Sequence, residues 1–316
     1  MMRREAATGK THPPKPRGRS VTAAKGAARP ARPGRVSPTA GRGPGLFHER
    51  RLWRDGHGIV AGMDEVGRGA WAGPVTVGVA VMKKGIRKIP NGLRDSKQLL
   101  EPVRESLYSP VGTWCAAWAV GHAWPEECDG LGMTKALRLA ARRAFASLQP
   151  EAYPDAIILD GKFDFVSPRP NKAVEDQEFV QGEMITDDPR VSRFRWSSVE
   201  DPVYLELDDV RLPDGNCPAV KTVVKGDDIC ASVAAASVLA KVTRDRMMRA
   251  DSASYPGFDF ELNKGYPSPS HKCALRGYGL TAIHRRSWAF VDWLPLRSEW
   301  DPPSRLDTVA AQILVD

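Results

Sequence analysis

Paired cysteines, long apolar runs and a secretory leader are all missing from this sequence. Its five cysteines are odd in number and contain no C-x-x-C pair, which argues against a zinc site or a disulfide framework and predicts a reducing compartment. The longest apolar stretch, 231–240, is interrupted by two serines and is too short to span a membrane. Because the N-terminus also lacks an apolar h-region, we expect a cytoplasmic protein without membrane contact.

Acidic residues are almost absent from the first 46 positions. Residues 1–46 contain eleven Lys or Arg and one acid, Glu5, within a chain of net charge +8. The segment is rich in Pro, Gly and Ala and has no hydrophobic period, so it is predicted to be disordered. It is interpreted as a solvated extension or a weak tether for a polyanion. A transit peptide also fits its composition, although Pro and Gly would break an amphipathic helix.

The rest of the chain has a near-neutral, globular composition. Apolar residues make up 42% of the whole sequence, too much for a fully disordered chain. Short apolar runs at 59–63, 75–82 and within 111–120 predict three strands in an antiparallel meander. Two further short strands are predicted at 156–159 and 221–224.

Two helices are predicted among these strands. Apolar residues recur at steps of three and four over 133–148, which predicts an amphipathic helix with Arg138, Arg142 and Arg143 off its apolar stripe. A second helix, from Asp228 to about Ala250, has a middle made almost entirely of Ala, Ser and Val. Such small side chains predict that this helix approaches the sheet closely.

The segment 162–220 differs from its surroundings. It carries 13 acidic residues against 7 basic ones, with scattered prolines and weak periodicity. Because long structureless loops are uncommon inside compact domains, we expect a partly ordered or flexible insertion.

Asp64 and Glu65 are the first candidates for chemistry. These adjacent carboxylates follow an apolar strand and precede a Gly67-Arg68-Gly69 loop. Burying them together is costly unless a cation compensates, and oxygen ligands suit Mg²⁺. Strand neighbours face opposite sides, so both serve one site only where the strand ends or bends. Flexible glycines also allow backbone amides to approach a sugar or phosphate. The alternative is a surface Asp-Glu pair before a tight turn.

Two more acids lie at similar positions in the chain. Asp160 ends the predicted strand 156–159, where the alternative is an ordinary Asp-Gly turn. Asp227 precedes the small-residue helix, where either Asp227 or Asp228 is expected to act as N-cap and leave the other free. Acids at three strand ends or helix starts favour convergence on one metal site.

Basic and aromatic residues accompany these acids in sequence, among them Lys97, Lys241, Arg244, Tyr266 and the segment 284–288. Lys and Arg contact phosphates, and aromatic rings stack on bases or sugars. The alternative for most of them is a solvated charge or a local salt bridge, above all for Arg246 and Lys272.

Taken together, the motifs resemble the ordered set of the ribonuclease HII (type 2 ribonuclease H) family. The segments that carry this resemblance are Ala61–Gly69, Arg94–Lys97, Leu159–Gly161, Lys225–Asp227, Ala234–Asp245 and His284–Ser287. The likeness spans roughly 46–161 and 219–291. It leaves out the tail, the insertion and the last twenty or so residues.

The resemblance implies an α/β fold of the ribonuclease H type, a mixed five-stranded sheet flanked by helices. It implies a catalytic domain at 47–296, interrupted by the insertion 162–220, between the tail 1–46 and a C-terminal extension 297–316. It further implies a monomeric endonuclease, dependent on Mg²⁺ or Mn²⁺, that hydrolyses the RNA strand of RNA–DNA hybrids and cuts 5′ of ribonucleotides embedded in duplex DNA. The expected mechanism is a two-metal in-line displacement that leaves a 3′-hydroxyl and a 5′-phosphate.

Particular residues acquire roles from this resemblance. Those implied to bind metal and catalyse are Asp64, Glu65, Asp160 and Asp227. Those implied to bind substrate are Gly67, Arg68 and Gly69 at the ribose 2′-OH, Tyr266 by stacking at the RNA–DNA junction, and Lys97 at a phosphate.

Three positions depart from the family's usual pattern. Asn263 and Pro267 replace a His and a Gly around Tyr266, and Asp228 stands where Ala is frequent. Another metal-dependent nuclease of the same fold and a catalytically silent nucleic-acid-binding protein are the competing hypotheses.

Overall fold

The computed structural model of this chain describes residues 43–86, 88–167 and 217–294. Most of the predicted tail, most of the insertion and the whole extension 297–316 therefore lie outside the described residues. The helices and strands, in chain order, are α1 Phe47–Arg54, β1 Ile59–Val66, β2 Val75–Lys83, η1 Ser96–Gln98, α2 Glu101–Trp114, β3 Ala117–Ala123, α3 Pro125–Ala146, η2 Pro150–Ala152, β4 Ala156–Asp160, β5 Ala219–Val223, α5 Gly226–Ile229, α6 Ala231–Ser252, α7 Phe260–Asn263, α8 Pro269–Tyr278 and η4 Ala289–Trp293.

The five strands form one mixed sheet in the order β3-β2-β1-β4-β5. β1 pairs antiparallel with β2, and β2 pairs antiparallel with β3. β4 lies parallel to β1, and β5 lies parallel to β4. The sheet confirms the predicted mixed five-stranded fold, and its first three strands confirm the antiparallel order.

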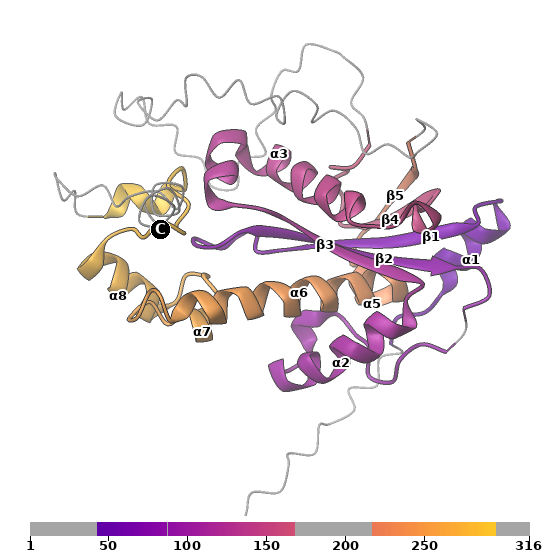
Figure 1. Cartoon of the computed structure of the whole chain (residues 1–316), viewed down its shortest axis with the longest axis horizontal. Helices are drawn as coiled ribbons and strands as arrows, with labels where there is room; N and C mark the ends of the chain where they lie inside the picture. Colours follow the sequence, from indigo (N-terminus) through magenta and orange to yellow (C-terminus); the bar gives the residue numbers. More distant parts are fainter. Residues whose placement is uncertain (1–42, 87, 168–216, 295–316) are drawn as a thin grey trace, which may run out of the picture. The chain divides into compact units, whose positions relative to one another are not determined.

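Helices cover both faces of the sheet, with α3 on one side and α6 and α2 on the other (Figure 1). Two apolar clusters fill the two interfaces. Val60, Ile158 and Leu239 belong to the cluster beneath α6, whereas Met63 and Leu159 belong to the cluster beneath α3. Alternate residues of β1 and β4 thus face opposite helices, as strand geometry requires.

The small-residue helix approaches the sheet as closely as predicted. A Cβ added at Gly62 of β1 would lie 2.2 Å from the backbone carbon of Ser232, and one at Gly78 of β2 would lie 2.6 Å from the carbonyl oxygen of Ala236. Glycine at these positions lets the backbones of α6 and the two central strands touch. The residues 228–250, however, form two helices, because Cys230 adopts an extended conformation between α5 and α6.

The structure also corrects the prediction for the run 111–120. Its first four residues close α2, and strand β3 begins only at Ala117. Val111 and Trp114 have strong strand propensity, but Val111 is fully buried on the face of α2 that packs in the cluster beneath α6. Burial of a helix face therefore outweighs local propensity here.

Arg138 of α3, predicted to lie off the apolar stripe of its helix, is nevertheless buried. It is 9% exposed, and its guanidinium donates to the carbonyl oxygens of Phe165 and Ser167. Phe165 and Val166, at the start of the predicted insertion, are buried in the cluster beneath α3. The first residues after Asp160 are thus packed against the core.

The packed chain also begins slightly earlier than residue 47. Leu46 is buried, and Gly45 exchanges backbone hydrogen bonds with Ile229 and Ala231 at the junction of α5 and α6. None of the described helices is both long and apolar enough to cross a membrane.

Candidate active site

Three of the predicted acids lie at one end of the sheet, on the α6 side. Met63 of β1 pairs with Leu159 of β4. Asp64 and Asp160 are the next residues of these two neighbouring parallel strands. Asp160 pairs with Val223, the last residue of β5, and the chain then turns directly into α5, which carries Asp227. The Gly226 amide donates to Asp160 Oδ1 at 2.7 Å, joining this turn to the end of β4.

Glu65 differs from the other three acids. β1 does not end or bend at Asp64 but continues to Val66, still paired with β2; only its pairing with β4 stops at Met63. Asp64 and Glu65 are therefore successive residues of a regular strand, in which side chains alternate between the two faces of the sheet. Its Oε1 lies 3.8 Å from Arg68 Nη1, beside the glycine loop.

Burial dominates the electrostatics of this group. Asp64 is 3% exposed and Asp227 is 4% exposed. Burial, followed by the negative charge of Glu65, raises the pKa of Asp64 well above its ordinary value, although the Ser237 hydroxyl opposes this. Burial also raises the pKa of Glu65 and of Asp160, with added repulsion from Asp160 and Asp227 respectively. The site therefore holds more negative charge than its surroundings stabilise.

Lys97 is a cation beside Asp64 and Asp227. The Asp95 carboxylate caps η1 by accepting from the Lys97 amide at 2.8 Å, and Lys97 Nζ lies 3.3 Å from Asp227 Oδ2. Partial burial opposes the charge of Lys97, but the carboxylates of Asp64, Asp227 and Asp95 outweigh it and raise the pKa of the ammonium. Its side chain as a whole remains 68% exposed.

The donor chemistry fits a hard divalent cation. Buried carboxylate oxygens with raised pKa are groups whose charge a Mg²⁺-like ion would stabilise. Within the described residues, no three His, Cys, Asp or Glu side chains are grouped closely enough to coordinate one ion. Asp64, Glu65, Asp160 and Asp227 are therefore not arranged around a single ion position in this structure.

Neither Asp227 nor Asp228 is a helix cap, contrary to prediction. Lys225, in the left-handed conformation, precedes α5, and Cys230 precedes α6, without a side-chain cap on either helix. Asp228 Oδ1 instead accepts a hydrogen bond from Gln98 Nε2 of η1. Its charge thus lies beside the segment that carries Lys97.

Two buried arginines donate hydrogen bonds to the backbone of the glycine loop after β1 and of the residues that follow it. Arg285, fully buried, donates to the carbonyl oxygens of Gly67, Arg68 and Gly73. Arg244, equally buried, donates to the carbonyl oxygens of Pro74, Ala72 and Lys264. Sequence reasoning placed both arginines among possible phosphate contacts, yet they brace the loop backbone instead.

Gly67 shows how tightly this loop is packed. Its φ is +85°, and an added Cβ would lie 2.3 Å from Arg244 Nε. Gly69, by contrast, has open space around its Cα. The loop therefore has one rigidly supported glycine and one open to a ligand.

Tyr266 contacts the same loop from the C-terminal part of the chain. Its hydroxyl accepts a hydrogen bond from the Gly67 amide at 3.0 Å. The preceding carbonyl, of Gly265, accepts from the amides of Trp71 and Ala72. Asn263 supports this turn, since its side chain accepts from the Gly265 amide and donates to the Phe258 carbonyl.

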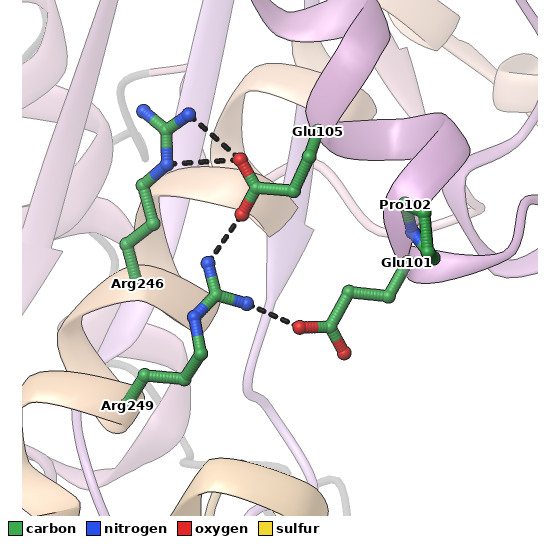
Figure 2. Close-up of a pocket in the computed structure, with 5 residues that line it drawn as sticks. All are labelled: Glu101, Pro102, Glu105, Arg246 and Arg249. Atoms are coloured by element: carbon green, nitrogen blue, oxygen red, sulfur yellow. Dashed lines mark hydrogen bonds and ion pairs between the residues drawn. The ribbon is translucent and has the colours of Figure 1, made fainter.

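Arg246 and Lys272 have local roles, as their alternative interpretation proposed. Arg246 and Arg249 of α6 form ion pairs with Glu105 and Glu101 of α2, around a hollow on the surface (Figure 2). Lys272 Nζ lies 5.6 Å from the centre of the Trp71 ring. The ion pairs fix α2 against α6, and η1 with Lys97 leads directly into α2.

Most of this chain is similar in sequence to proteins of one known family. A family model described as ribonuclease HII matches residues 61–177 and 207–291, and every predicted site residue falls in these ranges. Two curated proteins named ribonuclease HII are similar. That of Streptomyces avermitilis is 43% identical over 75% of this chain and 79% of its own length. That of Paracoccus denitrificans is 37% identical over 81% of this chain and 97% of its own.

A solved structure gives the same result for the fold. The ribonuclease H2 of Pyrococcus horikoshii OT3 superposes with a TM-score of 0.52 at 28% sequence identity. The match covers 74% of this chain and 96% of that one.

Proposed function

The chain belongs to the ribonuclease HII family, and from this premise we propose that it hydrolyses the RNA strand of RNA–DNA hybrids and cuts 5′ of ribonucleotides embedded in duplex DNA. The family makes it a metal-dependent endoribonuclease. The observation that supports this substrate is a contact between the acidic residues and the glycine loop. Glu65, next to Asp64 in β1, forms an ion pair with Arg68 of the glycine loop, and the backbone of that loop accepts hydrogen bonds from the buried Arg285.

The carboxylates have the first role in the proposed reaction. Asp64, Asp160 and Asp227, with Glu65, would hold two divalent cations, Mg²⁺ or Mn²⁺. There they would supply Lewis-acid chemistry, activation of water and stabilisation of negative charge on the leaving 3′ oxygen, for an in-line displacement that yields a 3′-hydroxyl and a 5′-phosphate. Asp64 and Asp160 are favoured as ligands by the same burial that raises their pKa.

The substrate would be positioned by groups beside the carboxylates. Gly67, Arg68 and Gly69 would recognise the ribose 2′-OH, the group that distinguishes RNA from DNA. Their backbone is fixed by Arg285, and the open space at Gly69 lets a sugar approach. Tyr266 would stack at the RNA–DNA junction, and Lys97, whose side chain is largely exposed, would contact a phosphate.

The test compares three labelled duplexes, in Mg²⁺ and in Mn²⁺: all DNA, DNA with one ribonucleotide, and a uniform RNA–DNA hybrid. We expect cleavage of the second and third only, with the cut 5′ of the single ribonucleotide. Asp64→Asn is expected to lower cleavage at least as much as loss of one transition-state-stabilising group, about 10²–10³-fold, while hybrid binding stays measurable.

Asp55→Asn is the matched control, because Asp55 is exposed at the end of α1 and should leave cleavage unchanged. Equal cutting of duplexes with and without a ribonucleotide would favour another nuclease of this fold. Binding without cleavage in either metal would favour a silent binding protein.

A further inference from the structure

Two histidines form a buried pair that the proposed function does not use. His271 of α8 is fully buried, and His284, in the loop after α8, is 1% exposed. Their Nε2 atoms lie 2.9 Å apart. Two imidazoles at this distance share one proton, because only one of the two nitrogens can donate.

The hydrogen bonds around the pair fix both tautomers. The backbone amide of Thr281 donates to His284 Nδ1 at 2.9 Å, so that nitrogen carries no proton. Neutral His284 then carries its proton on Nε2 and donates to His271 Nε2. His271 must therefore carry its own proton on Nδ1, which lies 2.9 Å from the carbonyl oxygen of Tyr266. All three hydrogen bonds run in one direction and end at Tyr266.

The surroundings keep this pair neutral. Aromatic rings enclose it, those of Trp71, Phe258, Phe260 and Phe290. Burial lowers the pKa of both imidazoles, and for His284 the neighbouring His271 and the charge of Arg286 lower it further. A neutral pair keeps the direction of its hydrogen bonds.

Tyr266 is thus held at two points. His271 fixes its backbone carbonyl, and the Gly67 amide fixes its hydroxyl. We infer that His271, oriented by His284, is a positioning residue for Tyr266, setting the angle at which the tyrosine ring meets the RNA–DNA junction. This inference rests on the proposed function, in which Tyr266 stacks at that junction.

The experiment uses two amide substitutions at one position. In His271→Asn the amide nitrogen replaces Nδ1 and can still donate to Tyr266. In His271→Gln the amide reaches the position of Nε2, so the bond to His284 can be kept and the bond to Tyr266 is lost. The measurement is kcat/KM on a duplex with one ribonucleotide, relative to the uniform hybrid, with thermal unfolding of each full-length variant.

We expect His271→Asn to stay within about threefold of wild type and His271→Gln to lose about tenfold, the factor that corresponds to one hydrogen bond. Both substitutions are repeated with Tyr266→Ala, where His271→Gln should have no further effect. A purely structural role predicts equal losses for Asn and Gln, and a Gln loss that persists without the tyrosine. Either of these results overturns the inference.

A second position keeps the test decisive if the first variants do not fold. His284→Gln keeps a donor to His271, whereas His284→Asn keeps only the bond with Thr281. The chain of hydrogen bonds from Thr281 through both histidines to Tyr266 predicts that His284→Asn has the larger loss of kcat/KM. The reverse order contradicts the inference. Failure of wild-type protein to cut the single-ribonucleotide duplex would refute the proposed function itself, independently of every histidine variant.

Discussion

At the scale of single residues, the site contains groups that are unfavourable for stability. Asp64 is almost fully buried, and Glu65 and Asp160 raise its pKa beyond the effect of burial alone. Carboxylates with raised pKa at the end of a sheet are typical of functional sites, where such perturbations cluster. Lys97 offsets part of this charge through Asp227. The chain therefore retains a charge distribution that stability alone would not select.

His122 of β3 gives a pH-dependent prediction at the same scale. Burial, then the charges of Arg244 and Arg143, lower the pKa of His122 to about 4. The unfolded chain binds a proton near pH 6.5, whereas the folded chain binds it only near 4. Stability from this group is thus complete above pH 6.5 and is lost as the pH falls to about 4, by about 3 kcal/mol in all.

The measurement is the free energy of unfolding in denaturant at pH 7 and pH 4.5, for wild type and His122→Asn. The amide can preserve the contact of His122 Nδ1 with Thr76 Oγ1 without titrating. Wild type should lose more stability than the variant between the two pH values. Buried carboxylates with raised pKa act in the opposite sense in both proteins, so they cancel in the difference. Parallel losses would contradict the prediction.

The acidic residues of the candidate site could be predicted from the sequence, whereas the arginines that support the glycine loop could not. Asp64, Asp160 and Asp227 were predictable because each lies at or near the end of a short apolar strand or the start of a helix. The roles of Arg244 and Arg285 were not, since they depend on contacts with residues about 170 and 218 positions away. A charged side chain that braces a backbone has the same local sequence as one that contacts phosphate.

At the scale of elements, α6 packs against the sheet with the two backbones in contact. Gly62 and Gly78 remove the side chains that would separate β1 and β2 from this helix. On the other face, a Cβ at Gly121 of β3 would lie 2.1 Å from the carbonyl oxygen of Ala140 in α3. Both helix–sheet interfaces thus use glycine in the strand and small residues in the helix.

Gly62→Ala is expected to destabilise the protein by about 3 kcal/mol or more, because the new methyl group meets backbone that cannot move aside. Gly130→Ala in α3 is the matched control. That glycine has open space around it and no positive φ, so alanine should be neutral or stabilise by under about 1 kcal/mol. Thermal unfolding of both variants checks the prediction, and similar midpoints would contradict it.

The close approach of α6 was predictable, because its run of Ala, Ser and Val is visible in the sequence. The helix α2 was not, because Val111, Trp114 and Trp118 read equally well as a strand. Tertiary packing decided this case, since Val111 is buried under α6 whereas Trp118 lies in β3.

At the scale of the whole molecule, the charge is divided between the tail and the rest. Residues 1–46 carry a net charge of +10 and residues 47–316 a net charge of −2, which together give the +8 of the whole chain. Part of that negative charge lies in the carboxylates of the proposed metal site, and part in the segment 162–220. Cation binding at the site would leave the described surface more favourable to a polyanion.

Deletion of residues 1–42, which spares the packed Leu46, tests the tail. We expect weaker hybrid binding and a smaller slope of log affinity against log salt, because fewer phosphate contacts release fewer counterions. Fluorescence anisotropy at several salt concentrations measures both quantities. The cut position on a single-ribonucleotide duplex should not change, and a shifted cut would assign the tail to the active site.

The bond between Arg285 and Gly67 joins residues 218 positions apart, and this has a consequence for protein synthesis. Contacts of such sequence separation form late, because the intervening chain must first be ordered. During translation, α6 and the strands can begin to pack while Arg285 is still inside the ribosome or not yet made. The chain as far as Asp227 therefore contains every proposed metal ligand before the residue that fixes the Gly67 backbone has been made.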